Sequence, residues 1–229
     1  MFGFIEKEFK FLSLILTIFT SFTFSSCATV KPMALNQKTT GLQMIQESIA
    51  IMTVKTSNQH RPQFQPDVWY VSVWSRDEKT PTKHMFRVDS PCNKNEKAFN
   101  EYLISMQLPP GQYKLRELAG FSGIFPIHGN FQVPLYLDFE LNNSQIVYLG
   151  RIEAVNRERK SDDELRAGSI LPLLDQAVAG FSGGTFDIKI CDDYDHDITL
   201  FKDKFPCLKN CDIEKAILPQ WYNPAQKDR

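Results

Sequence analysis

The chain has 229 residues, an apolar fraction of 42% and a formal net charge of −1. With 18 Phe it can bury the core of a single domain, which excludes a disordered chain. The near-neutral charge, without a basic patch or an RNA-binding motif, gives no reason to expect nucleic acid as a partner.

The first 26 residues have the pattern of a secretory signal peptide. Lys7 and Lys10 lie in a short polar head, and an uncharged apolar run follows from Phe11 to Phe24. This run of about 14 residues is shorter than the roughly 20 that a membrane-spanning helix needs. A buried N-terminal core helix is the alternative. We predict that residues 1–26 are an export signal and not part of the fold.

Small residues precede Cys27 in the stretch FSSC. This stretch resembles the lipobox of bacterial lipoproteins, whose cysteine is acylated after the signal is cleaved. The resemblance implies a lipid anchor on Cys27, with palmitate among its acyl chains. Because Ala28 follows the cysteine, it also implies sorting to the outer membrane of a Gram-negative cell. An ordinary signal-peptidase cut at Ser26-Cys27-Ala28 is the alternative. Residues 27–46 are polar and mixed, and we expect an anchor and a tether there.

Alternating apolar and polar residues dominate the range 47–191, which predicts a β domain. The clearest alternation runs from Val133 to Leu141; Asn142-Asn143 follows, and the pattern resumes at Ile146. We predict a hairpin there. A Pro110-Gly111 turn joins a strand ending at Leu108 to a strand around Tyr113. Further strands are expected near 49–55, 67–75, 83–89 and 185–191, and the stretch 67–75, apolar on both faces, should be central.

About eight short strands separated by turn residues are typical of an antiparallel β-sandwich. The stretches LPPGQYKLRE (108–117) and VYLGRIE (147–153) resemble transthyretin-like and carboxypeptidase-regulatory-like domains, which share the immunoglobulin-like sandwich architecture. The resemblance implies a domain that binds or supports other proteins without catalysis.

The range 192–229 turns helical. Ile198, Phe201 and Phe205 share one helix face, and Pro206 ends the run. A second short helix is expected over Asp212–Leu218. We expect this appendage to pack on the sandwich.

The other cysteines are disulfide candidates, since export permits disulfides: Cys92, Cys191, Cys207 and Cys211. A local Cys207–Cys211 bridge would leave Cys92 to pair with Cys191, although the sequence does not choose among three connectivities. A zinc site is the alternative, with only His196 nearby.

The stretch DDYDHD (192–197) carries clustered carboxylates. Asp193, Asp195 and Asp197 have the spacing that begins a calcium-binding EF-hand loop, but the loop then lacks its glycine and its final glutamate. We expect Asp195 or Asp197 to cap the following helix. A noncanonical cation site of an adhesion module is the alternative.

The stretch GFSGG (180–184) matches the nucleophile-elbow pattern of serine hydrolases. A secreted hydrolase would use Ser182 with His196. However, a strand pattern follows Ser182 where the elbow needs a helix, and AGFSG recurs at 119–123 without the final glycine. We expect both copies to be glycine turns. The sequence thus predicts a membrane-anchored envelope lipoprotein with a non-catalytic binding or structural sandwich. It has no expected cofactor or metal, and its partners are the lipid bilayer and another envelope protein.

Overall fold

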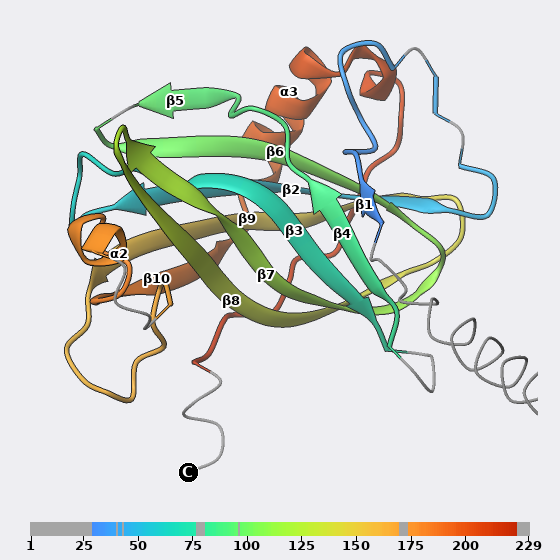
Figure 1. Ribbon diagram of the computed structural model, residues 1–229. Coiled ribbons are helices and arrows are strands. Elements are labelled where there is room, and N and C mark those ends of the chain that lie inside the picture. Colours follow the sequence, from blue (N-terminus) through green and yellow to red (C-terminus); the bar gives the residue numbers. More distant parts are fainter. Residues whose placement is uncertain are drawn as a thin grey trace, which may run out of the picture.

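The computed structural model describes residues 29–39, 41–42, 44–76, 81–95, 97–169 and 174–223. The predicted signal peptide and Cys27 lie outside these residues. Strands dominate the described chain, and they form two sheets packed face to face (Figure 1). The predicted mainly-β sandwich is therefore confirmed.

We call the sheet nearer the viewer in Figure 1 the front sheet. In spatial order it contains β1 (Val30–Lys31), β4 (Lys83–Arg87), β3 (Asp67–Ser75), β7 (Gly111–Ile124) and β8 (Ile127–Leu141). The back sheet contains β10 (Gly184–Cys191), β9 (Ile146–Glu158), β2 (Ser48–Asn58), β6 (Phe99–Leu108) and β5 (Asn93–Asn95), and β11 (Glu214–Lys215) also pairs with β9. The helices are α2 (Leu174–Val178), α3 (Tyr194–Lys204) and the 3₁₀ turn η1 (Pro206–Leu208).

The strand pairing differs from the antiparallel expectation at the centre of the back sheet. There β2 and β9 run parallel, and β1–β4 and β11–β9 are parallel as well. A parallel pair needs a long crossover, and here all the front-sheet strands except β1 lie between β2 and β9 in the chain. Alternation of apolar residues gives the face of each residue but not the direction of the neighbouring strand.

The predicted hairpin over 133–154 is wrong. Its two strands exist as β8 and β9, but they belong to different sheets, and Asn142-Asn143 carries the chain from one layer to the other. The hairpin of the front sheet is β7–β8, which turns at Phe125-Pro126 and keeps its pairing out to Ile124 and Ile127. The first AGFSG copy lies inside β7, so the prediction that it is a turn is also wrong.

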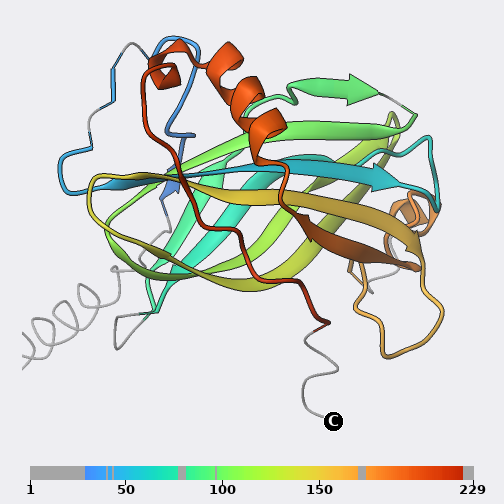
Figure 2. The same cartoon turned by 180° about the vertical axis from the view of Figure 1, so that it is seen from behind.

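Apolar side chains fill both faces of the back sheet. Ala50, Met52 and Val54 of β2 belong to the core between the sheets, whereas Ile49 and Ile51 face the other side. That outer face is covered by α3, whose Ile198 and Phe201, with Phe205, pack on it (Figure 2). The predicted helix after residue 192 is therefore confirmed, and its packing explains why β2 is apolar on both faces.

The C-terminal segment forms no second helix over Asp212–Leu218. Instead β11 pairs with β9 at Val147 and Tyr148, just beyond the point where β10 ends opposite Arg151. Leu218 then donates a backbone hydrogen bond to Leu149 and is buried. Unpaired backbone groups at this edge of β9 outweigh the weak helical pattern of the segment.

Part of the segment expected to be a tether belongs to the fold. Val30 and Lys31 form β1 against β4, and Met33 and Leu35 are buried. The backbone N–H of Leu35 also donates to the Ser105 hydroxyl at 2.9 Å. No helix in the described residues is both long enough and apolar enough to span a bilayer.

Candidate functional site

Two polar regions of the sandwich could carry a function, and the first is a buried ionic cluster beneath α3. Arg151 of β9 contacts Glu101 of β6 through Nη1 (2.6 Å), Asp197 of α3 through Nη2, and Asp193 through Nε at 3.3 Å. The hydroxyl of Tyr148 donates to Asp197 Oδ2 at 2.6 Å. We call these five residues the Arg151 cluster. The side chains of Arg151, Glu101 and Asp197 are at most 9% exposed.

The charges of the Arg151 cluster stabilise one another. Burial by itself would lower the pKa of Arg151, but the hydrogen bonds and charges of Glu101 and Asp197 outweigh it and raise that pKa. Burial, and then the hydrogen bond to Asp197, raise the pKa of Tyr148, so its hydroxyl stays a donor. The cluster therefore holds a charged guanidinium between carboxylates.

The aspartates of the DDYDHD stretch are already engaged by protein. Asp193 and Asp197 both contact Arg151, and the candidate ligand atoms that lie near each other are those of Asp193, His196 and Asp197, without Asp195. A cation would have to displace the guanidinium from two of them, so this geometry does not favour the alternative Asp193-Asp195-Asp197 cation site. The capping prediction is wrong: Asp193 is the N-cap residue and its side chain makes no capping bond.

A pocket of about 1140 Å³ opens beside the Arg151 cluster. It lies between α3 and the start of β6, and its lining includes Cys92, Glu101, His196 and Lys204. The Cys92 thiol donates to the Glu101 carbonyl at 3.3 Å, and burial raises its pKa, with a further increase from the Glu101 charge. Cys92 thus remains a protonated thiol, which is a poor nucleophile.

The described cysteines form no disulfide. Cys191 ends β10 and Cys92 precedes β5, at opposite edges of the back sheet. Four strand spacings of about 4.8 Å separate them, far more than the Cα distance of about 4.4–6.8 Å that a bridge needs. The connectivity that would pair Cys92 with Cys191 is therefore inconsistent with the fold. Cys207 and Cys211 lie near each other, but the Cys211 thiol donates to the Cys207 carbonyl at 3.3 Å instead of bonding its sulfur.

The proposed catalytic pair of the GFSGG stretch is not brought together. Ser182 lies in the turn before β10, where Gly180 has φ +82°, and His196 lies in α3 beyond the other end of that strand. The strand alone is roughly 23 Å long at 3.3 Å per residue. A hydrolase with Ser182 and His196 is inconsistent with this geometry, whereas the glycine turn predicted for this second copy is confirmed.

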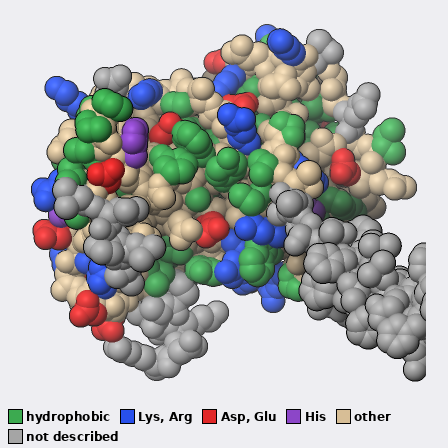
Figure 3. Space-filling model, viewed as in Figure 1, with side chains coloured by type: hydrophobic (Ala, Val, Ile, Leu, Met, Phe, Trp, Pro, Cys, Tyr) green, Lys and Arg blue, Asp and Glu red, His purple; other side chains and the backbone are tan. Residues whose placement is uncertain are grey.

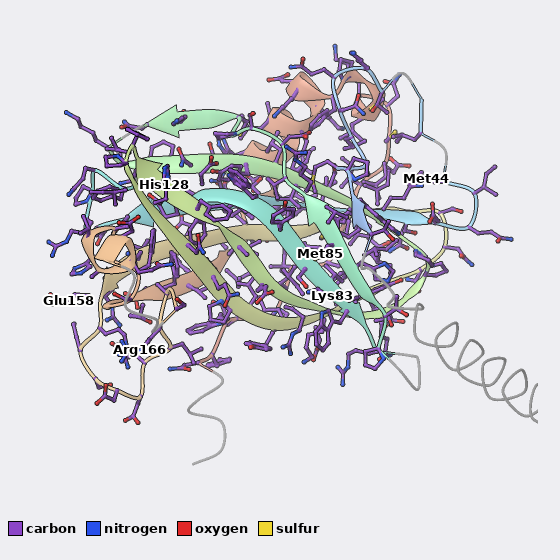
Figure 4. The ribbon with its side chains drawn as sticks, in the orientation of Figure 1. Met44, Lys83, Met85, His128, Glu158 and Arg166 are labelled. Atoms are coloured by element: carbon purple, nitrogen blue, oxygen red, sulfur yellow. The ribbon has the colours of Figure 1, made fainter. Side chains whose placement is uncertain are left out.

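The second polar region is a groove of about 440 Å³ at the far end of the β7–β8 hairpin, which we call the hairpin groove. The front sheet contributes Asp67, Trp69, Phe121, Ser122, Ile124 and His128 to its lining. Facing them are Gln63 and Gln65 of the β2–β3 loop, Lys94 and Asn100 of the back sheet, and Lys97 of the turn between β5 and β6. Figure 4 labels His128 at this end of the sandwich, and Figure 3 shows hydrophobic side chains gathered beside a histidine in the same area.

Aromatic side chains are exposed at the rim of the hairpin groove. Trp69 is 45% and Phe121 37% exposed, and their rings meet edge to face with centroids 4.7 Å apart. The Trp69 indole N–H donates to Asp67 Oδ2 at 3.3 Å, and the other oxygen of Asp67 accepts from the Tyr102 hydroxyl at 2.7 Å. Asp67 therefore fixes the orientation of the indole.

Two residues that line the groove each carry a buried polar atom without a partner among the described residues: Asn100 Oδ1 and Ser122 Oγ. Asn100 is 2% and Ser122 3% exposed. The amide nitrogen of Asn100 donates to the Pro66 carbonyl at 2.9 Å, so the side chain is held in place with its acceptor oxygen free. A buried polar atom without a partner costs about 1–3 kcal/mol, which a bound molecule could recover.

Sequence reasoning missed the hairpin groove. Trp69 was read as part of a central strand, and Ser122 as part of a glycine turn. A signal was present in DVWYVSVWS, because an aspartate two residues before a tryptophan puts both on the same face of a strand. Asn100 carried no comparable pattern.

Comparison with known protein families, with curated proteins and with solved structures finds no match for this chain.

Proposed function

We propose that this protein is a lipoprotein of the cell envelope whose β-sandwich is a non-catalytic binding module, with the hairpin groove as its binding site. The observation that carries the proposal is the pair of buried, unpartnered polar atoms in a groove whose rim exposes an oriented tryptophan. A few fixed polar atoms in a pocket lined partly by aromatic side chains are typical of ligand-binding sites.

The position of β1 supports an anchor close to the domain. Val30 already pairs with Met85, and only two residues separate it from Cys27. Three steps of extended chain span at most about 10 Å, so acylation of Cys27 would hold the sandwich against the membrane surface. Ala28 after the cysteine is consistent with an outer-membrane lipoprotein, as the lipobox resemblance implies.

The groove lies away from the proposed anchor. β1 and the tip of the β7–β8 hairpin are at different ends of the sandwich in both views (Figures 1 and 2). The strand register agrees. Val30 pairs with Met85, Met85 with Ser72, and Ser72 with Glu117 of β7, so these four residues lie in one row across the sheet. Glu117 is seven residues before Ile124 at the hairpin tip. Seven residues correspond to roughly 23 Å of strand. An anchored molecule would therefore present its groove away from the bilayer.

The anchor is tested by metabolic labelling with palmitate. Cys27→Ser should lose the label and leave the membrane fraction, whereas the control Cys92→Ser should keep both. A Cys27→Ser protein that is still labelled and still membrane-bound contradicts the anchor.

The binding module is tested by site-specific photo-crosslinking in living cells. A benzophenone amino acid in place of the exposed groove residue Lys97 should give adducts. The same group in place of Tyr222, which is 79% exposed and outside the groove lining, should give none. Equal yields at the two positions contradict the groove as a binding site.

A further inference from the structure

The chemistry of the hairpin groove narrows the class of ligand that fits it. Asn100 Oδ1 can only accept a hydrogen bond, and the Ser122 hydroxyl can donate or accept. A purely apolar ligand would bury both without a partner at a cost of about 1–3 kcal/mol each. Hydroxyl groups suit both atoms, since a hydroxyl can donate to the amide oxygen and can accept from the serine.

β5 and β8, which contribute Lys94 and His128 to the groove, are edge strands, but Phe121 and Asn100 in its lining have strand partners on both sides. Asp67 pairs with Phe121, Phe121 also pairs with Asn130, and Asn100 pairs with both Thr56 and Lys94. Peptides that bind by strand addition take their affinity from unpaired backbone groups at a sheet edge. Contacts with Phe121 and Asn100 therefore depend on their side chains.

The rim adds a surface that suits one face of a sugar ring. Because the indole N–H of Trp69 already donates to Asp67, what this half-exposed side chain offers a ligand is its apolar ring. The C–H groups of a pyranose are polarised positively, and the face of an aromatic ring is negative, so the two attract as they exclude water. The remaining lining offers amide, carboxylate, imidazole and ammonium groups, which complement sugar hydroxyls.

We propose that the hairpin groove binds a carbohydrate chain, with a sugar ring on Trp69 and ring hydroxyls on Asn100 Oδ1 and Ser122 Oγ. This inference rests on the proposed function and names the ligand class of the same site. A groove of about 440 Å³ lies within the usual range of small-ligand sites, about 300–1,000 Å³. Because it faces away from the proposed anchor, a glycan of the cell envelope could reach it.

The test is calorimetry of the full-length protein in detergent with three tetrasaccharides: chitotetraose, cellotetraose and a sulfated glycosaminoglycan tetramer. At least one should bind with a dissociation constant below 1 mM, a threshold typical of weak but specific sites on the order of −4 kcal/mol. Trp69→Ala should weaken binding at least tenfold. Ser122→Ala should weaken it several-fold without lowering the unfolding temperature, because the hydroxyl has no partner among the residues that the structure describes. Tyr222→Ala, which removes an exposed aromatic ring elsewhere, should change nothing.

The carbohydrate inference is overturned if none of the three tetrasaccharides binds at millimolar concentration, or if Trp69→Ala binds as tightly as the parent. Photo-crosslinking at position 97 distinguishes a groove that binds something other than a carbohydrate from a groove that binds nothing. Protein or peptide adducts at that position, with no sugar binding, would overturn the carbohydrate inference and leave a binding module. Adduct yields no higher than at position 222 would overturn both.

Discussion

The Arg151 cluster and the hairpin groove both bury polar side chains. They differ in whether the hydrogen-bonding atoms of those side chains have partners within the protein. In the cluster, Asp197 is shared by Arg151 and Tyr148, and both partners come from the protein itself. In the groove, Asn100 Oδ1 and Ser122 Oγ have no partner among the described residues, beside exposed aromatic rings. In the cluster the charges are paired within the protein and only Arg151 Nε lacks a hydrogen bond among the described residues, whereas in the groove no group of those residues compensates the two open atoms. Burial of polar residues alone therefore does not identify a site.

Removal of Arg151 should produce the largest effect on stability. Arg151→Ala leaves the buried carboxylates of Glu101 and Asp197 without their cation, which typically costs about 3–5 kcal/mol. Arg157→Ala is the matched control on the same strand, because its contacts with Glu164 and Asp187 are partly exposed and worth at most about 1 kcal/mol. Urea denaturation of the two variants measures the difference. Equal losses would mean that the Arg151 cluster is not the closed structural unit inferred here.

The next largest effect concerns the hydroxyl of Tyr148. Tyr148→Phe removes a hydrogen bond to a charged group, a loss of about 1.5–3 kcal/mol at pH 7. The raised pKa of Tyr148 adds a pH dependence: the folded state keeps the proton that the unfolded chain loses above about pH 10. The contribution of the Tyr148 hydroxyl to the free energy of unfolding should therefore be fully present below pH 10 and should be lost as the pH rises beyond it.

Denaturation curves recorded between pH 7 and pH 11 test this prediction. Tyr148→Phe should show a weaker alkaline loss than the parent, and Tyr222→Phe, which changes an exposed ring, should follow the parent. Tyr102 contributes in the same direction, because burial and its hydrogen bond to Asp67 raise its pKa too. An alkaline loss that is unchanged in Tyr148→Phe would contradict the assignment.

The sequence predicted those parts of the fold that depend on local patterns. Alternation located most strands, and the spacing of Ile198, Phe201 and Phe205 located α3. It did not give strand neighbours, because sheet membership depends on contacts between residues far apart in the chain. For the same reason the pairing of Arg151 with Glu101, 50 residues away, and with Asp197, 46 residues away, had no local signature.

The candidate site was missed for a related reason. Asn100, Ser122 and Trp69 lie on three strands and meet only when the two sheets pack. The DDYDHD stretch, by contrast, attracted attention as a metal motif because its carboxylates are adjacent in sequence. The structure assigns two of them to Arg151 instead. Local clusters of functional groups are easily recognised, whereas sites assembled by the fold are not.

The smallest of the three predicted losses of stability concerns a glycine in each of the two AGFSG copies. A Cβ on Gly120 would lie 1.9 Å from the Asp67 carbonyl oxygen, so β3 and β7 approach too closely there for any side chain. Gly120→Ala should cost about 1–3 kcal/mol. It should also weaken carbohydrate binding, because the strain falls between Asp67 and Phe121 at the groove. Gly183→Ala, in the other copy, has no heavy atom within 4 Å of the added Cβ and should leave both properties unchanged. Thermal unfolding and calorimetry of the two variants test this contrast. If Gly120→Ala is as stable as Gly183→Ala, the close approach of β3 and β7 that shapes the groove wall is contradicted.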